Sequence, residues 1–116
     1  MKIELLKSKI HRATVTDANL DYIGSITLDE TLMNAAGLHE YEKVHVLNIS
    51  NGSRLETYVI RGAADSGEVC INGAAAHLVS KGDLVIIAAY CTLGVADLND
   101  FSPSIVHVNE YNKISS

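Results

Sequence analysis

Hydrophobic and polar residues alternate along most of the chain, which is the pattern of β-strands with one buried face. Between two of the alternating stretches stands Asn51-Gly52, a pair typical of β-hairpin turns. Clusters of glycine, serine, asparagine and aspartate separate the other stretches, as turns require. We therefore expect strands over residues 3–16, 44–50, 53–62, 69–72, 84–93 and 104–111.

Short helical segments interrupt these strands. Residues 28–37, LDETLMNAAG, predict a helix that Gly37 ends, since glycine commonly closes helices. The segment 72–79, NGAAAHLV, can open a second helix, and its small residues allow a ligand or another backbone to approach closely. VADLND at 95–100 predicts a third, short helix. Many short strands with brief helices in 116 residues predict a mainly β single domain over 1–116, either a closed barrel or a sandwich.

Two alternations indicate which side chains share a face of a strand. Lys7, Lys9 and His11 are spaced by two and so lie on one face of the first strand. In the strand after Asn51-Gly52, alternate residues face opposite ways. Arg54, Glu56, Tyr58 and Ile60 share one face, and Leu55, Thr57 and Val59 share the other.

The net charge of the chain limits the kinds of molecule that it could bind. The formal net charge is −5, which argues against a nucleic-acid partner because neutralising phosphates needs a surplus of clustered cations. Basic residues nevertheless crowd the N-terminus. Lys2, Lys7, Lys9 and Arg12 there form either a local anion site or a solvated strand edge that lysines protect from aggregation.

We expect a cytoplasmic protein with no membrane partner. The first 12 residues interrupt every apolar run with charge, unlike a secretory signal, and the longest apolar run, 84–91, is far shorter than the roughly 20 residues that span a bilayer. Cys70 and Cys91 lie in apolar runs without metal-ligand spacing, so we expect buried, reduced thiols and no metal.

The apolar stretch LDYIGSITLDE at 20–30 contains Gly24 followed directly by Ser25. Taken alone, such a pair in a strand indicates a bulge or a turn. Glycine also leaves its carbonyl open to attack, and serine supplies a hydroxyl nucleophile when neighbouring groups activate it.

Three blocks together resemble the pyruvoyl-dependent aspartate 1-decarboxylases closely. They are HRATVTDANLDYIGSITLD at 11–29, NGSRLETYVI at 51–60 and NGAAAHLVSKGD at 72–83. The resemblance runs in register from about Lys9 to the last strand. It implies a six-stranded double-psi β-barrel with short helices, assembled as a homotetramer with active sites between subunits.

The resemblance also implies that the Gly24–Ser25 peptide bond cleaves itself, giving chains 1–24 and 25–116. Ser25 would become a pyruvoyl group that forms a Schiff base with L-aspartate and releases CO2 to give β-alanine for pantothenate and coenzyme A synthesis. This covalent group would replace pyridoxal phosphate, and no metal is implied. The resemblance leaves open whether a maturation factor assists cleavage and how strictly aspartate is preferred over glutamate.

Site roles follow residue by residue from the same resemblance. Arg54 would clamp a substrate carboxylate, Lys9 would add positive charge and Tyr58 would donate a proton. Thr57 would assist self-cleavage and touch substrate, although alternation places it opposite Tyr58; either the strand twists or bulges, or the two residues serve neighbouring sites. The remaining pocket residues implied are Asn72, Gly73, Ala74 and Ala75, with Tyr22 and His11 nearby.

One position departs from the pattern: some family members carry a large aromatic residue where this chain has Leu47, which affects either the pocket wall or subunit packing. Two other functions stay open. A non-catalytic barrel would keep Ser25 as an ordinary side chain in an uncleaved chain. A hydrolase would use Ser25 or Cys70 as a persistent nucleophile, although no histidine is placed beside either by a recognisable pattern.

Overall fold

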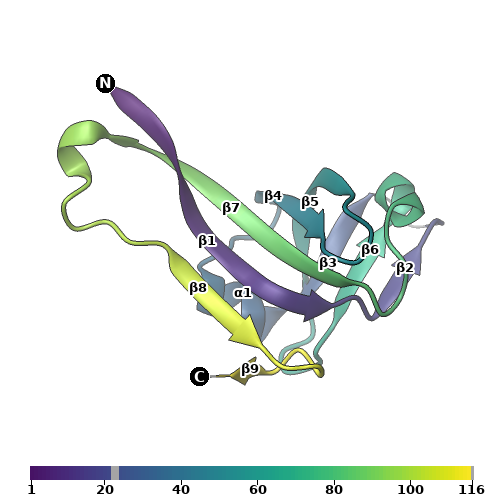
Figure 1. Cartoon of the computed structure of the whole chain (residues 1–116). Coiled ribbons are helices and arrows are strands. Elements are labelled where there is room, and N and C mark those ends of the chain that lie inside the picture. The colour runs from purple at the N-terminus through teal and green to yellow at the C-terminus, as the bar shows by residue number, and fades with distance from the viewer. Residues whose placement is uncertain (22–23, 116) are drawn as a thin grey trace.

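The computed structural model describes residues 1–21 and 24–115, which form a mainly β domain with one short α-helix (Figure 1). The mainly β class expected from the alternation is confirmed. In chain order the elements are β1 (Lys2–Thr14), β2 (Asp17–Asn19), β3 (Ser25–Asp29), α1 (Glu30–Ala36), β4 (Lys43–Asn48), β5 (Arg54–Gly62), β6 (Val69–Asn72), the 3₁₀ helix η1 (Gly73–His77), β7 (Leu84–Gly94), the 3₁₀ helix η2 (Val95–Asp97), β8 (Ser104–Val108) and β9 (Ile114–Ser115).

The strands pair in the order β2-β6-β3-β5-β4-β7-β1-β8-β9. Three of the pairs, β1 with β8, β2 with β6 and β3 with β5, are parallel, and the others are antiparallel. Among the described residues no pairing joins β2 to β9, so the sheet is not closed. Figure 1 shows β1 and β7 running side by side as a long twisted ribbon.

Every predicted strand is present, with ends shifted by a few residues. Prediction missed β3, and it missed β2 and β9, which are too short to show an alternation. The helix predicted from residue 28 begins at Glu30, because Leu28 and Asp29 pair with β5. Gly37 ends it in the left-handed region, with φ 67°, as the C-cap pattern indicates.

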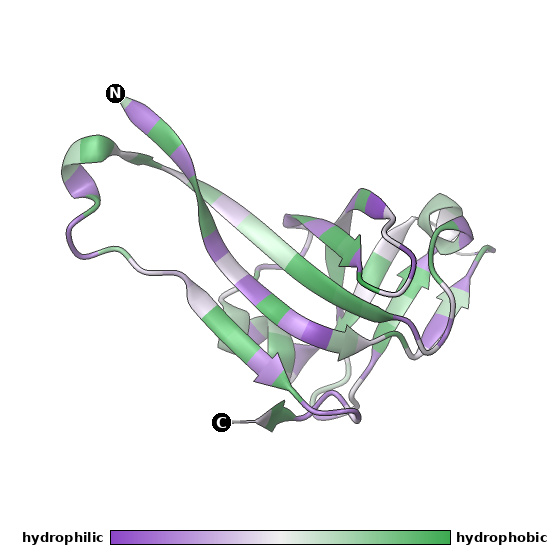
Figure 2. Ribbon diagram, in the orientation of Figure 1, coloured by the Kyte–Doolittle hydropathy of each residue, from purple (hydrophilic) through white to green (hydrophobic). Residues whose placement is uncertain are grey.

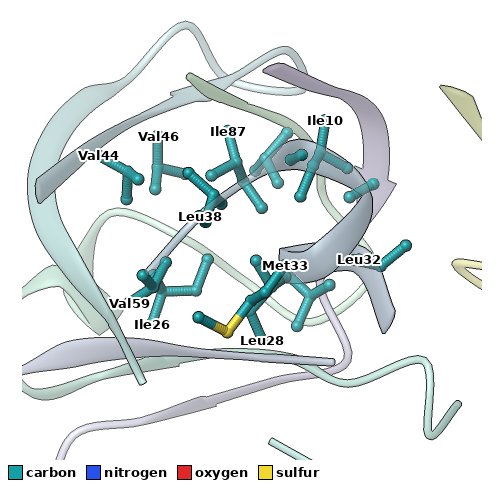
Figure 3. Close-up of a cluster of buried hydrophobic side chains, with 14 of the residues drawn as sticks. Ile10, Ile26, Leu28, Leu32, Met33, Leu38, Val44, Val46, Val59 and Ile87 are labelled. Carbon is teal, nitrogen blue, oxygen red and sulfur yellow. The ribbon is translucent and has the colours of Figure 1, made fainter. Parts of the chain in front are cut away.

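The core lies inside the curl of the sheet. In Figure 3, side chains from β4, β7 and β1 line one side of it, side chains from β5 and β3 line the other, and Leu38 and Met33 lie between. Burying these aliphatic side chains is the main favourable term in folding, at about 25 cal/mol per Å² of apolar surface. The labelled members are Ile10, Ile26, Leu28, Leu32, Met33, Leu38, Val44, Val46, Val59 and Ile87.

The middle of the first strand is interior, because residues 8–10 of β1 pair with β7 on one side and with β8 on the other, whereas the part before Ser8 pairs with β7 alone. The interpretation of a lysine guarding a solvated edge is therefore wrong for Lys9, whereas Lys2 and Lys7 lie in the part of β1 that pairs on one side only. Figure 2 shows hydrophilic and hydrophobic bands alternating along β1. Ser8 and Ile10 are buried while Lys7, Lys9 and His11 are half-buried, but the β1–β7 register shifts between Leu6 and Ser8 and between Ile10 and Ala13, so the regular alternation behind the one-face prediction is interrupted.

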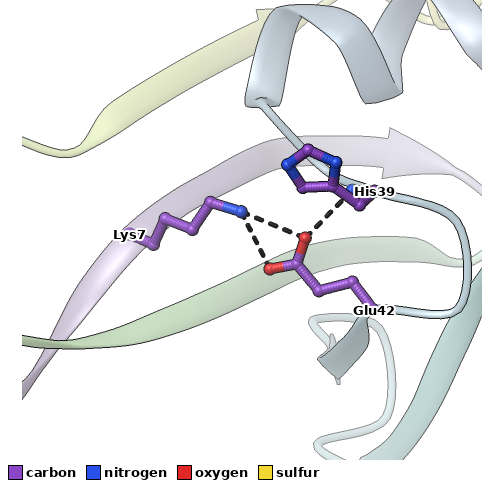
Figure 4. A network of polar contacts seen from close by, with 3 residues as sticks. All are labelled: Lys7, His39 and Glu42. Atoms are coloured by element: carbon purple, nitrogen blue, oxygen red, sulfur yellow. Dashed lines mark hydrogen bonds and ion pairs between the residues drawn. The ribbon is translucent and has the colours of Figure 1, made fainter.

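Lys7 is used within the fold. Its Nζ lies 2.9 Å from Oε2 and 3.0 Å from Oε1 of Glu42, and Glu42 Oε1 also accepts a hydrogen bond from the backbone N–H of His39 at 3.0 Å (Figure 4). This half-buried network ties β1 to the connection between α1 and β4. Because Lys7 is paired with Glu42, its charge is not available to an anion site on this face.

A buried carboxylate holds the end of β3. Asp29 Oδ1 accepts from the N–H groups of Thr31 and Asp65, and Oδ2 accepts from the N–H of Gly67, at 2.8 to 2.9 Å. Burial alone disfavours the charged form, but the three N–H groups outweigh it with help from Lys113, and the pKa of Asp29 is lowered. The carboxylate thus caps α1 and fixes the β5–β6 connection at once.

We predict that Asp29→Asn destabilises the domain. The amide oxygen can keep two of the bonds, but an NH₂ group would then face the N–H of Gly67, which costs about 1–3 kcal/mol of unfolding free energy. Urea unfolding at pH 7 measures this loss. The exposed Asp100→Asn is the control, and equal stability of both variants would contradict the role of Asp29.

The same carboxylate predicts a pH dependence. Because the pKa of Asp29 is lower in the folded chain, its contribution is complete above the ordinary value of 3.8 and is lost as pH falls through the folded value. The stability difference between wild type and Asp29→Asn should therefore be constant from pH 5 to 7 and shrink below 3.8. Urea midpoints across this range measure it, and a constant difference would contradict it.

Candidate active site

Four side chains gather on the face of β3 and β6 that points away from the core. Ser25 pairs with Asn72 and Thr27 pairs with Cys70 across the antiparallel ladder. Residues two apart share a face of a strand, so these four lie together, and we call them the Ser25 cluster. The residues between them face inward: Ile26 and Ile71 are fully buried in the core.

Hydrogen bonds join the Ser25 cluster. Asn72 Nδ2 donates to Ser25 Oγ at 2.9 Å and to Thr27 Oγ1 at 3.0 Å. Cys70 Sγ donates to Asn72 Oδ1 at 3.3 Å. Ser25 is fully buried and Asn72 is buried, whereas Thr27 and Cys70 are half-buried. A buried hydroxyl held by an amide is geometrically defined, which a reacting nucleophile requires.

Gly24 lies in a bend directly before β3, so the Gly24-Ser25 pair stands at the start of the strand and not inside it. No described atom outside the neighbouring residues lies within 4 Å of the position that a Cβ would take at Gly24. Crowding around that position therefore does not account for glycine there.

Tyr58 is level with Ser25 on the other side of β3. Ile26 pairs with Val59 in the parallel β3–β5 ladder, so carrying the register back by one residue places Ser25 beside Tyr58 on the same face. The Tyr58 ring is half-buried and lies 6.5 Å from the ring of Tyr41, between centroids. Ser25 thus has Asn72 of β6 on one side and Tyr58 of β5 on the other.

Thr57 lies on the opposite face from Tyr58. It pairs with Val44, whose side chain is fully buried in the core. The β4–β5 register from Lys43 to Arg54 is continuous, so no bulge turns Thr57 toward the outer face within these described strands. The bulge considered for Thr57 is therefore wrong, whereas a twist of the strand and neighbouring sites stay predictions.

Arg54 begins β5, four residues before Tyr58 and so roughly 13 Å from it along the strand. Its side chain is exposed and lines a hollow of about 400 Å³ together with His45, Leu47 and Glu56. Leu47 pairs directly with Arg54 across the β4–β5 ladder. The position that departs from the family pattern is therefore part of the wall beside this arginine.

Lys9 and His11 lie on β1, and three strands separate them from β3 in the sheet order. Lys9 pairs with Ala88 of β7 and Ile105 of β8. The His11 ring meets that of His107 edge-on, with centroids 5.6 Å apart. Burial, and then the charges of Lys9, His107 and Arg12, lower the pKa of His11, so its imidazole is neutral at pH 7.

The backbone after Asn72 turns at once into η1. Gly73 has a φ of 68°, in the left-handed region that favours glycine. Ala74 is exposed, and Ala75 is half-buried against the core. The small residues predicted to line a pocket thus follow directly on the amide that holds Ser25.

The structure brings some of the predicted residues together and leaves others apart. Ser25, Tyr58, Asn72 and Gly73 are neighbours, whereas Arg54, Lys9 and His11 lie elsewhere on the outer face of the sheet. Prediction missed Thr27, which the spacing of two from Ser25 could have revealed. Tyr22 lies outside the described residues.

Both cysteines are free thiols, as expected, but each is half-buried and not buried. Cys70 faces away from the core because its neighbours Val69 and Ile71 face into it. Burial, followed by the charges of Asp17 and Glu68, raises the pKa of Cys70 and keeps it protonated. A protonated thiol is a poor nucleophile, which argues against a hydrolase built on Cys70.

Within residues 1–21 and 24–115, no group of three or more histidine, cysteine or acidic side chains is arranged to hold a metal ion. In the same part of the chain, no helix has the length and apolar character needed to cross a membrane.

Comparison with known proteins identifies the family. The family model described as aspartate decarboxylase matches residues 1–115. The chain is 61% identical over 114 residues to an aspartate 1-decarboxylase of Caldicellulosiruptor bescii, covering 98% of this chain and 89% of the relative. It is 58% identical over 115 residues to an aspartate 1-decarboxylase of Campylobacter fetus, covering 99% of both chains.

A third relative, the aspartate 1-decarboxylase of Caldicellulosiruptor saccharolyticus, is 62% identical over 114 residues, which is 98% of this chain and 89% of the relative. These matches extend through β3, β5 and β6, and so include every residue around Ser25 described above. The chain therefore belongs to the aspartate decarboxylase family.

Proposed function

We propose that this chain is a self-processing L-aspartate 1-decarboxylase, a carboxy-lyase that forms β-alanine for pantothenate and coenzyme A synthesis. Family membership along residues 1–115 supports the reaction and its substrate. The observation that carries the proposal is the fully buried Ser25 hydroxyl at the start of β3, directly after Gly24 and held by the Asn72 amide.

The proposed maturation begins with attack of Ser25 Oγ on the carbonyl carbon of Gly24. The Gly24–Ser25 amide bond breaks, the serine nitrogen takes the hydroxyl proton, and an ester joins residue 24 to Oγ. Loss of the Ser25 α-proton then breaks the Cβ–Oγ bond and releases chain 1–24 with its carboxylate. One water molecule hydrolyses the remaining dehydroalanine to a pyruvoyl group and ammonia, at the head of chain 25–116.

The residues around position 25 fit a pyruvoyl carbonyl group whose reaction with substrate needs no metal ion. The Asn72 amide donates to Ser25 Oγ, and Tyr58, whose phenol is a hydrogen-bond donor, is level with Ser25 on the neighbouring strand. A pyruvoyl group supplies an electron sink for the electrons that the departing carboxylate leaves behind. Tyr58 would deliver the proton that replaces CO2 on the substrate α-carbon.

Arg54 and Lys9 would bind the substrate carboxylates. Both are on the outer face of a curled sheet, and Lys9 is four strand steps, roughly 19 Å along the sheet, from Ser25. Side chains on the outside of a curl diverge, so one chain does not bring them together. We therefore propose that subunits of a homotetramer complete each site across their interfaces.

The same proposal extends to fold and location. The curled sheet around one core is compatible with a six-stranded double-psi β-barrel, and the family supports it. Two free thiols favour the cytoplasm, where disulfides are rare. The substrate pocket would be lined by Gly73, Ala74, Ala75 and His11. Thr57 would assist cleavage. A maturation factor would be required only if the purified chain stays intact.

We predict that wild-type protein resolves into two chains, 1–24 and 25–116, on intact-mass spectrometry under denaturing conditions. Hydrazine should label the larger chain, because its N-terminus would be a ketone. Ser25→Ala should give one unlabelled chain and no β-alanine. An intact wild-type chain that stays intact with cell extract would support the non-catalytic barrel, and cleavage of Ser25→Ala would refute the pyruvoyl assignment.

Tyr58→Phe should mature normally but decarboxylate slowly. It removes one hydroxyl, and loss of a positioned general acid lowers kcat by about 10²- to 10⁴-fold. β-Alanine formation is measured on protein already shown to be cleaved. The exposed Tyr111→Phe is the control, and unchanged turnover in Tyr58→Phe would remove Tyr58 as the proton donor.

Arg54→Ala should raise KM for aspartate by about 10- to 100-fold, the loss expected from a charged hydrogen-bonded pair. Arg54→Lys should recover part of this, since lysine keeps the charge but not the planar fork. Arg61→Ala, on the same strand, is the control. An unchanged aspartate dependence of Arg54→Ala would contradict the clamp.

A further inference from the structure

A buried amide ties the hairpin between β4 and β5 to the loop that follows η1. Asn48, the last residue of β4, is buried, and its Nδ2 donates to Asp83 Oδ2 at 2.8 Å and to the Leu78 carbonyl at 3.3 Å. Its Oδ1 accepts from the backbone N–H of Ser50 at 2.9 Å. A carbonyl can only accept and an N–H can only donate, so these contacts define one orientation of the amide.

The Asp83 carboxylate is held at the same point. Its Oδ2 also accepts from the backbone N–H of Ser80 at 2.9 Å, so one oxygen joins the hairpin to the loop after η1. These two hydrogen bonds, that from Asn48 first, lower the pKa of Asp83 against the effect of its burial. The carboxylate is therefore ionised at neutral pH, and an ionised carboxylate only accepts hydrogen bonds.

This network reaches the residue before Arg54. The backbone N–H of Asn48 donates to the Ser53 carbonyl at 2.8 Å, and the N–H of Ser53 donates to Asn51 Oδ1 at 2.8 Å. Arg54 follows directly in the chain, and Asn48 and Arg54 line one hollow of about 280 Å³. The network therefore fixes the backbone from which the Arg54 side chain extends.

The other end of the network is η1. Asn48 Nδ2 and Asn51 Nδ2, at 3.3 and 3.0 Å, both donate to the carbonyl of Leu78, which caps the end of η1. At its start, η1 follows directly on Asn72, which pairs with Ser25. A 3₁₀ helix rises about 2 Å per residue, so its five residues cover roughly 10 Å. The β4–β5 hairpin is thus tied, through η1, to the β3–β6 pair.

We propose that Asn48 and Asp83 are positioning residues for substrate binding, which hold the β4–β5 hairpin against η1 so that Arg54 meets the substrate carboxylate. This inference rests on the function proposed above, in which Arg54 binds that carboxylate. Neither residue touches the substrate in this role. They act through the backbone of residues 48–54 and through the Leu78 carbonyl.

Fixed presentation of Arg54 matters for a site that subunits complete together. An arginine fork binds a carboxylate through two parallel hydrogen bonds, which require a defined approach of both groups. A hairpin released from η1 would present the guanidinium over a range of positions. Binding of aspartate would then weaken, because the free energy of ordering the hairpin would be spent at each binding event.

The first test measures KM and kcat for aspartate on protein already shown to be cleaved. Asp83→Ala should raise KM by about tenfold, at the lower end of the effect expected for Arg54→Ala, and keep kcat within about twofold of wild type. Asp83→Asn should keep KM within about threefold of wild type, because one amide oxygen can accept both hydrogen bonds that Oδ2 accepts.

Asp29→Asn is the matched control. Asp29 also accepts backbone N–H groups through a carboxylate, but it lies at the other end of β3, so its loss should lower the melting temperature and leave KM unchanged. If Asp83→Ala does not fold, Asn51→Ala provides the test. Asn51 is exposed and donates to the same Leu78 carbonyl, and its loss should raise KM by about threefold.

A double-mutant cycle tests whether the effect passes through Arg54. In the Arg54→Ala background, Asp83→Ala should raise KM by less than about twofold further, because the side chain that it positions is already absent. An unchanged KM in Asp83→Ala or in Asn51→Ala would overturn the proposal. So would an equally raised KM in Asp83→Asn, or a full additional rise in the double variant.

A second readout does not depend on activity. In Asp83→Ala, backbone hydrogen exchange should accelerate by about tenfold at Ser50 and Leu78, whereas Ile26 and Ile71 of the β3–β6 pair should keep wild-type rates. If wild-type protein forms no β-alanine, the proposed function fails, while this measurement still decides whether Asp83 holds the hairpin. Unchanged exchange at Ser50 and Leu78 would overturn that role.

Discussion

The pairing of β3 with β6 is the constraint on which the site depends. It places Ser25 opposite Asn72, although 47 residues separate them in the chain. Because Ile26 and Ile71 are fully buried in the core, a slip of one residue would turn the Ser25 cluster inward and the isoleucines outward. Hydrophobic burial thus sets the register that positions the Ser25 hydroxyl.

The two ends of β3 are held differently. At the C-terminal end of β3, the Asp29 carboxylate accepts hydrogen bonds from three backbone N–H groups and so joins α1 to the β5–β6 connection. At its start, Ser25 accepts a hydrogen bond from the side-chain amide of Asn72, which also accepts one from Cys70 Sγ. The hydrogen bonds of Asp29 resemble ordinary helix capping. The buried polar network around Ser25 contributes more to the geometry of the site than to the stability of the fold.

The curl of the sheet explains why the predicted residues do not all meet. The core occupies the inside, so the polar side chains of β1, β5, β3 and β6 lie on the outside and diverge. Lys9, Arg54 and Ser25 therefore share a face without sharing a site in one chain. A fold of this kind is suited to sites that neighbouring subunits complete.

By itself, the sequence determined the local structure and the family. Its alternation placed the long strands, Gly37 the end of the helix, and three motif blocks the decarboxylase resemblance, because each depends on residues close together in the chain. Only the tertiary structure decided that residues 8–10 of β1 pair on both sides and that Cys70 reaches Asn72. Local periodicity shows which residues share a strand face, but the choice of neighbouring strand and register comes from core packing between distant segments.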